Sequence, residues 1–206
     1  AALIEGTNLT IHTTNTFAGV DPNEPLHFQN ADRKTVWWSW TAPFSGLVDF
    51  DVTGTGPYGV VAYTGSLLTT LQKVGQNPVG PSFHTNMRVT EGVTYLFAAD
   101  GLDGNYGEFD FHLKLFPTPT NDLFANRTVL AGTNISSDII IGDAGMEPGE
   151  PPLTNCGPRT LWWSFTPDSV GVAQFSAANI GPAGTIDISI FQGSNLVNLI
   201  QRVNGV

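Results

Sequence analysis

Residues 35–41, Thr-Val-Trp-Trp-Ser-Trp-Thr, alternate in a way that predicts a β-strand. Successive side chains of a strand point to opposite faces, so Val36, Trp38 and Trp40 share one face. The other face carries Trp37 among small polar residues. Because a half-solvated sheet buries its apolar face, we expect Trp38 and Trp40 to lie in the core. The alternation does not explain Trp37.

The same alternation recurs in short runs between Gly, Pro, Asn and Asp. In residues 108–116, large apolar side chains alternate with polar and charged ones, the pattern of a strand with one buried face. Further strands are predicted at 47–52, 59–65 and 94–100, and the Gly- and Asp-rich residues 100–107 predict a hairpin connection. Short strands joined by such turns indicate an all-β protein.

The chain also repeats itself. Residues 6–25 align with residues 132–151 at an offset of 126, with eight of twenty positions identical. Residues 35–46 then align with 160–171 at an offset of 125, with six of twelve identical. A period of this length suits one β-sandwich per copy rather than a short solenoid coil. Trp163 takes the place of Trp38, so we expect it to be buried as well.

The repeat sets the expected domain boundaries. Residues 1–116 form the first sandwich repeat, 117–120 a Pro-rich linker, and 121–206 the second repeat. The second copy has no counterpart of residues 80–116, so it is expected to lack its C-terminal strands. Either the chain is a fragment of a longer array, or a neighbouring chain supplies strands to the open edges.

Composition and charge narrow the function classes. The formal net charge of −10 repels phosphate backbones, so nucleic acid is not an expected partner. No apolar run is long enough for a membrane span, and no leader sequence is recognisable. Cys156 is the single cysteine, so no intrachain disulfide can form, and we expect a partly buried, unreactive thiol. An acidic surface suits a secreted or cell-surface protein.

Catalytic motifs are not found, and the chain is not expected to be an enzyme. Four oxygen-bearing residues form the densest candidate metal site, Asp100, Asp103, Asn105 and Glu108. Calcium binds six to eight oxygens in flexible geometry, so this loop could hold one. The alternative is a hairpin whose Asp and Asn side chains bond to their own backbone.

Trp37 and its counterpart Trp162 are the candidate contact residues, with three explanations. An exposed indole could stack on sugar rings, or it could be an anchor covered by a neighbouring domain or subunit. The long segment 17–34 could instead fold over it within the same repeat. The sequence alone leaves the three open.

Several of these strings together resemble a known family. The features "NDLFANR", "LAGTN", "EPGEP" and "TLWWSFTP", followed by "GVTYLFAADGLDGNYGEFDFHLKL", resemble tandem repeats of large secreted bacterial proteins that are similar to pre-peptidase C-terminal domains. The resemblance implies a jelly-roll-like antiparallel sandwich with an accessory, non-catalytic role. It also implies calcium-binding Asp residues around the strand ending at 65, where this chain has "GPYGVVAYTG" and "VGQNPVG" and keeps only Asp187 in the second copy.

The repetition favours a structural role, because spacer, adhesion and filament modules are commonly duplicated in tandem. The first hypothesis is an exported structural or adhesive module of a cell-surface stalk or extracellular filament. Its partners would be neighbouring copies or adjacent repeats. The second is a carbohydrate-binding accessory module of a secreted hydrolase or protease, with glycans as the partner.

Overall fold

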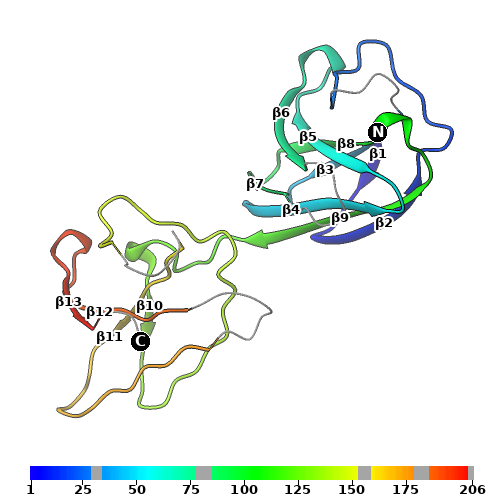
Figure 1. The fold of residues 1–206 in the computed structure, drawn as a ribbon. Helices are drawn as coiled ribbons and strands as arrows, with labels where there is room; N and C mark the ends of the chain where they lie inside the picture. Colours follow the sequence, from blue (N-terminus) through cyan, green and yellow to red (C-terminus); the bar gives the residue numbers. More distant parts are fainter. Residues whose placement is uncertain (29–33, 78–84, 153–158, 179–185, 204–206) are drawn as a thin grey trace. The chain divides into compact units, whose positions relative to one another are not determined.

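Two separate units make up the chain, Ala1–Pro117 and Thr118–Val206, which are called the first and the second unit (Figure 1). The structure is a computed structural model that describes residues 1–28, 34–77, 85–152, 159–178 and 186–203. Cys156 lies outside the described residues. Within them, no helix is long and apolar enough to cross a membrane.

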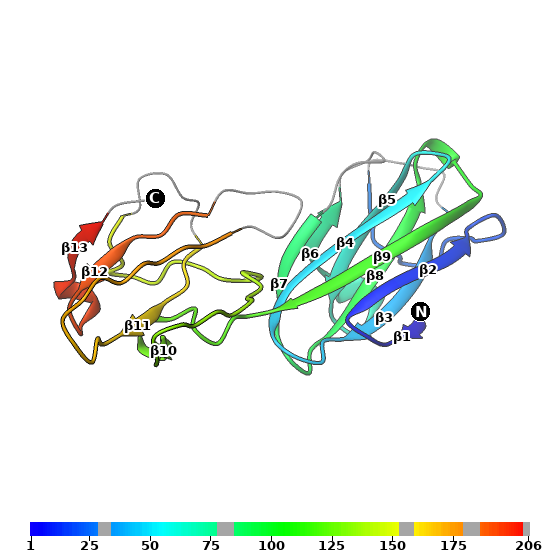
Figure 2. The ribbon, with the colours of Figure 1, turned by 90° about the horizontal axis from the view of Figure 1, so that it is seen from below.

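The first unit is a sandwich of two β-sheets, seen as two layers in Figure 2. One sheet has the order β1-β3-β8-β5-β6 and the other β2-β9-β4-β7. Apart from the short β1, this is the strand order of a jelly roll, so the predicted all-β, jelly-roll-like sandwich is confirmed. The strands are β1 (Ala2–Ile4), β2 (Asn8–Thr14), β3 (Val36–Thr41), β4 (Gly46–Gly54), β5 (Tyr58–Thr64), β6 (Gln72–Asn77), β7 (Thr85–Val89), β8 (Thr94–Gly101) and β9 (Glu108–Pro117).

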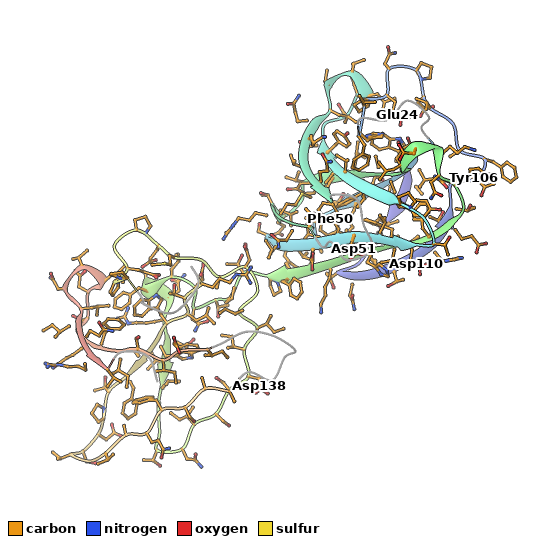
Figure 3. All side chains as sticks on the ribbon, viewed as in Figure 1. Glu24, Phe50, Asp51, Tyr106, Asp110 and Asp138 are labelled. Atoms are coloured by element: carbon orange, nitrogen blue, oxygen red, sulfur yellow. The ribbon has the colours of Figure 1, made fainter. Side chains whose placement is uncertain are left out.

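The core of the first unit lies between these sheets. Trp38 and Trp40 of β3 are buried as predicted, and Trp38 stacks on Phe111 of β9 with ring centroids 4.7 Å apart. Phe50 of β4, labelled in Figure 3, meets Phe97 of β8 edge-on at 5.2 Å. The alternating apolar residues of β9 all point into this core, which confirms the sequence pattern.

The second unit has two small sheets among its described residues. β10 (Thr128–Leu130) pairs in parallel with β11 (Trp163–Phe165), and β12 (Ile190–Gln192) pairs antiparallel with β13 (Ile200–Val203). Single 3₁₀ turns stand at Phe124–Asn126 and Leu196–Asn198, and the first unit has such turns at Leu68–Thr70 and Leu102–Gly104.

Both pairings repeat those of the first unit. Ala2 lies opposite Trp38, and Thr128 lies opposite Trp163, which are aligned positions of the two copies. The β12–β13 pair also repeats the β5–β6 pair, with the same irregularity, between Ala62 and Tyr63 in one unit and at Ile190 and Phe191 in the other. The two units therefore share local architecture as well as sequence.

The prediction that Trp163 is buried is wrong. Its side chain is 38% exposed, whereas Trp38 is 4% exposed. Phe165, the counterpart of Trp40, is exposed as well. The cause is the opposite layer: Trp38 is covered by β9, and no sheet among the described residues of the second unit lies over Trp163.

Candidate functional site

A loop before the tryptophan strand has the same hydrogen bonds in both units. In the first unit, the Ala18 N–H donates to the Asn15 carbonyl and the Glu24 N–H to the Asp21 carbonyl, at 3.0 and 3.1 Å. In the second unit, the aligned bonds measure 2.8 and 3.2 Å and end at Ala144 and Glu150. The loop of each copy therefore presents a glutamate at the same place.

Each loop turns through a left-handed residue just before its glutamate. Asn23 has φ +67° and the aligned Gly149 has φ +95°. Asn and Gly are the residues that adopt this conformation at the lowest cost. The sequence difference between the copies at this position is therefore conservative in backbone terms.

The side chain of Glu24, labelled in Figure 3, is buried in the first unit. Its Oε2 accepts a hydrogen bond from the Asp21 N–H at 3.0 Å, and its Oε1 lies 2.9 Å from His27 Nε2. An ionised carboxylate only accepts, so His27 Nε2 carries the proton. His27 Nδ1 then lies 2.8 Å from the hydroxyl of Tyr63. The result is a buried chain from carboxylate to imidazole to phenol.

The pKa of Glu24 is lowered from its ordinary value. Burial acts in the opposite direction and would raise it. The nearby Thr35 hydroxyl, the hydrogen bonds from the Asp21 backbone and His27, and the charge interaction of His27 together outweigh the burial. Glu24 is therefore held as an anion within the loop, and His27 links it to Tyr63 of β5.

Trp37 packs against His27 and Tyr63 of this hydrogen-bonded series, within the same unit. Its ring lies 5.1 Å from that of His27, edge-on, and 5.8 Å from that of Tyr63. The residue is half-buried, and its Nε1 makes no hydrogen bond within the described residues. The loop thus lies against Trp37 within one unit, which was the third explanation for this residue. Contact of Trp37 or Trp162 with a ligand or subunit stays a prediction.

In the second unit the indole itself binds the loop. Glu150 accepts from the Thr160 hydroxyl at 2.8 Å, from Trp162 Nε1 at 3.1 Å and from the Glu147 N–H at 3.2 Å. Trp162 lies 6.0 Å from Phe191, as Trp37 lies beside Tyr63. One acidic residue per copy therefore anchors the loop, to β5 through His27 and Tyr63 in the first unit and to Trp162 directly in the second.

The sequence did not point to Glu24, His27, Tyr63 or Glu150 as a group. A signal was present, because Glu24 and the following Pro are among the eight identities of the first aligned segment. Thr160 and Trp162, which donate hydrogen bonds to Glu150, are identical in the two copies as well. Polar residues that stay identical in a divergent repeat mark side chains whose hydrogen bonds hold the fold.

The four proposed calcium ligands have different surroundings. Asp100 is buried, and its Oδ1 accepts from the Lys34 N–H at 2.9 Å. Asp103 sits in a tight turn with φ +53°, and Asn105 closes that turn by donating its N–H to Leu102. Glu108 is exposed and lies 3.9 Å from His12.

Asp100 thus binds the main chain of a distant residue, and Asn105 closes its turn through its own main chain. In the part of the chain that the structure describes, no group of three or more His, Cys, Asp and Glu side chains could hold a metal ion. Calcium binding by Asp100, Asp103, Asn105 and Glu108 stays a prediction.

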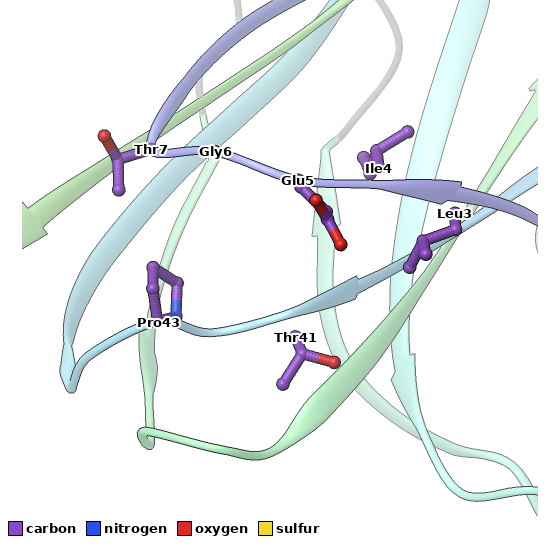
Figure 4. A pocket seen from close by; sticks show the side chains of 7 residues that line it. All are labelled: Leu3, Ile4, Glu5, Gly6, Thr7, Thr41 and Pro43. Atoms are coloured by element: carbon purple, nitrogen blue, oxygen red, sulfur yellow. The ribbon is translucent and has the colours of Figure 1, made fainter.

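A shallow hollow of about 360 Å³ lies at the end of β1 (Figure 4). Glu5 is the single charged residue of its lining, and Thr7 and Thr41 are its polar side chains. The other lining residues are Leu3, Ile4, Gly6 and Pro43. This open, mostly apolar surface has no convergent polar groups of the kind that orient a small ligand.

Comparisons with known proteins complete the description. No family model matches the chain, and no curated protein matches it. Among solved structures, the chain is similar to the pre-peptidase C-terminal domain of a collagenase from Bacillus anthracis, with 16% identity and a TM-score of 0.40. That similarity covers 55% of this chain and 93% of that one.

Proposed function

We propose that the chain is an exported, non-catalytic module with a structural or adhesive role in a cell-surface stalk or extracellular filament. Sandwich units of one kind follow one another, and a strand from a neighbouring chain completes the second unit. The repeated strand pairs and the repeated glutamate loop support the first part of this proposal. The buried polar groups at that loop are engaged in holding the fold, which is the property of a scaffold.

The open apolar face of the second unit is the observation that carries the proposal. Trp163 and Phe165 expose more than a third of their surface on β11. Phe175 is exposed too, whereas its aligned counterpart Phe50 is buried. A hollow of about 520 Å³ lies beside Phe175 and Ile190. Contiguous exposed apolar surface of this kind is typical of an interaction site.

The first unit shows what kind of strands complete and cover such a face. There β8 pairs with the edge of β3, and β9 packs its alternating Phe and Leu side chains over Trp38. Among the described residues, β11 pairs with β10 alone, so its other edge is available for a strand. A neighbouring chain that offers a strand of the β9 pattern would fit by strand addition.

The net charge supports association through one apolar face rather than over the whole surface. At −10, the acidic chains repel one another except where apolar faces meet. This property suits an exported module that assembles through one surface.

The test is the assembly state of the full chain, measured by analytical ultracentrifugation over a concentration series and by electron microscopy. We expect concentration-dependent oligomers that the double substitution Trp163→Lys with Phe165→Lys abolishes. A peptide of residues 108–117 should compete with assembly. Leu67→Lys is the matched control, because Leu67 is exposed on the first unit. A chain that stays monomeric at every concentration contradicts the assembly proposal.

A further inference from the structure

The residues ahead of β10 dock on the glutamate loop of the second unit. Asp122 Oδ1 accepts from the Gly145 N–H at 2.7 Å, and the Thr118 hydroxyl donates to Asp143 at 3.3 Å. The Phe124 N–H donates to Glu147 Oε1 at 3.3 Å. Three polar contacts thus fix one short segment, residues 118–126, to one loop.

The same segment also docks on Trp162. Asn121 is fully buried, its main-chain oxygen accepts from the Trp162 N–H at 2.9 Å, and its side-chain amide donates to the Trp162 carbonyl at 3.0 Å. Phe124 meets the Trp162 ring edge-on at 5.1 Å, and Phe124 is itself buried. The Asn-Asp-Leu-Phe string of residues 121–124 therefore has a defined binding site.

In the first unit the aligned surface is uncovered. Phe17 is 98% exposed, whereas its counterpart Asp143 is 5% exposed. Ala18 is half-buried, whereas its counterpart Ala144 is buried. Gly19, the counterpart of Gly145, has open space where a Cβ would stand. The difference in exposure marks the footprint of the docked segment.

The strand register shows how such a segment would enter. In the second unit the segment runs directly into β10, with Thr128 opposite Trp163. In the first unit β1 has the identical register, with Ala2 opposite Trp38. A segment seated on the loop of the first unit would therefore end beside Ala1.

We propose that residues 16–19 and Trp37 form a docking surface for a segment of the pattern Asn-Asp-Leu-Phe-Ala-Asn that leads directly into β1. Residues 121–126 of a second copy are not the occupant, because Asn121 and Phe124 are buried in their own unit. This surface lies on the first unit and is independent of the strand addition proposed for the second. Asp21 stands where Glu147 accepts the Phe124 N–H, so that contact is expected to be weaker. Phe17 stands where Asp143 accepts from the Thr118 hydroxyl, so that contact is absent in the first unit.

The experiment places a copy of residues 118–126 directly ahead of Ala1 in the full chain, which reproduces the spacing to β10. We expect amide exchange at Ala18 and Gly19 to slow by about tenfold or more, since docking gives the Gly19 N–H an acceptor and covers both groups. We also expect the emission of the chain to shift to the blue, and Trp37→Phe to remove that shift. The control is the same addition with its Asn, Asp and Phe replaced by alanine.

Unchanged exchange at Gly19, or equal protection by the alanine control, would overturn the proposal. The exchange at Ala18 and Gly19 does not depend on whether the second unit recruits a strand, so the two proposals fail separately. The altered residues lie in the added segment, outside the folded unit, so a loss of protection in the control is not a folding defect of the sandwich.

Discussion

The two units hold the same glutamate loop in different ways. In the first unit, Glu24 is buried and binds His27, while the Trp37 ring only packs alongside. In the second unit, Glu150 is less buried and binds the indole of Trp162 directly. The shared part is the carboxylate, and the donor is exchangeable. A repeated acidic residue can therefore keep its role while its partner changes.

The units also differ in how far their strand tryptophans are covered. The inward face of β3 is covered by β9 of the other sheet, while Trp163 and Phe165 of β11 are exposed among the described residues. Similar strand sequences thus reach different burial, since burial depends on the opposite layer. Three measurements test these differences between the two units.

The largest effect is expected from Trp40→Ala compared with Phe165→Ala, the aligned positions. Trp40 is fully buried, and its Nε1 donates to the Gly6 carbonyl at 2.9 Å. Its truncation should lower the free energy of unfolding of the first unit by about 3–5 kcal/mol. The exposed Phe165 should cost the second unit about 1 kcal/mol or less. Denaturant unfolding with unit-resolved amide exchange measures both, and equal costs would contradict the difference in coverage.

A smaller effect is expected from removing the loop carboxylates. Glu24→Ala leaves the Asp21 N–H and the His27 Nε2 without their acceptor in a buried place. The expected loss is about 1–3 kcal/mol in the stability of the first unit. Glu150→Ala should cost the second unit less, because Glu150 is less buried.

Glu24→Gln is the matched control for size, since it keeps one acceptor oxygen. The stability of the first unit in this variant should lie between that in the parent chain and that in the Glu24→Ala chain. The same unit-resolved exchange measures it. A Glu24→Ala chain as stable as the parent would show that the loop is held by packing alone.

The smallest effect concerns pH. The native pKa of Glu24 is lowered from its ordinary value of 4.5, so the unfolded chain binds the proton more readily. The stabilisation is complete above about pH 4.5 and is lost as the pH falls through the native pKa. The first unit should therefore lose stability faster on acidification than the Glu24→Gln chain does. Parallel acid profiles of the two chains would rule out this contribution.

Much of the first unit could be predicted from the sequence. Alternation placed Trp38, Trp40 and the apolar residues of β9 correctly, because each of those faces has an opposite sheet. The same rule failed at Trp163, since alternation assigns a side chain to a face and says nothing of what covers that face. The alternation of a strand can be read from neighbouring residues, whereas burial depends on residues that are distant in the sequence.

The glutamate loop could have been predicted in part. Its residues lie in an irregular segment where periodicity gives no signal, and the bonds join Glu24 to residues on other elements. The aligned pair Asn23 and Gly149 was informative, because both residue types tolerate a left-handed turn. The partner exchange between His27 and Trp162 could not be predicted from either copy alone.

The pairing of β2 with β9 has a consequence for how the first unit acquires its structure. Asn8 lies opposite Lys114, so the first long strand completes its ladder with the last. A contact between such distant positions closes a long stretch of chain and forms late. When the chain emerges progressively from its N-terminus, from a ribosome or through an export pore, β2 has no partner until residues 108–117 have followed. The unit then completes its sheet in a single late step, in which β9 pairs with β2 on one edge and with β4 on the other.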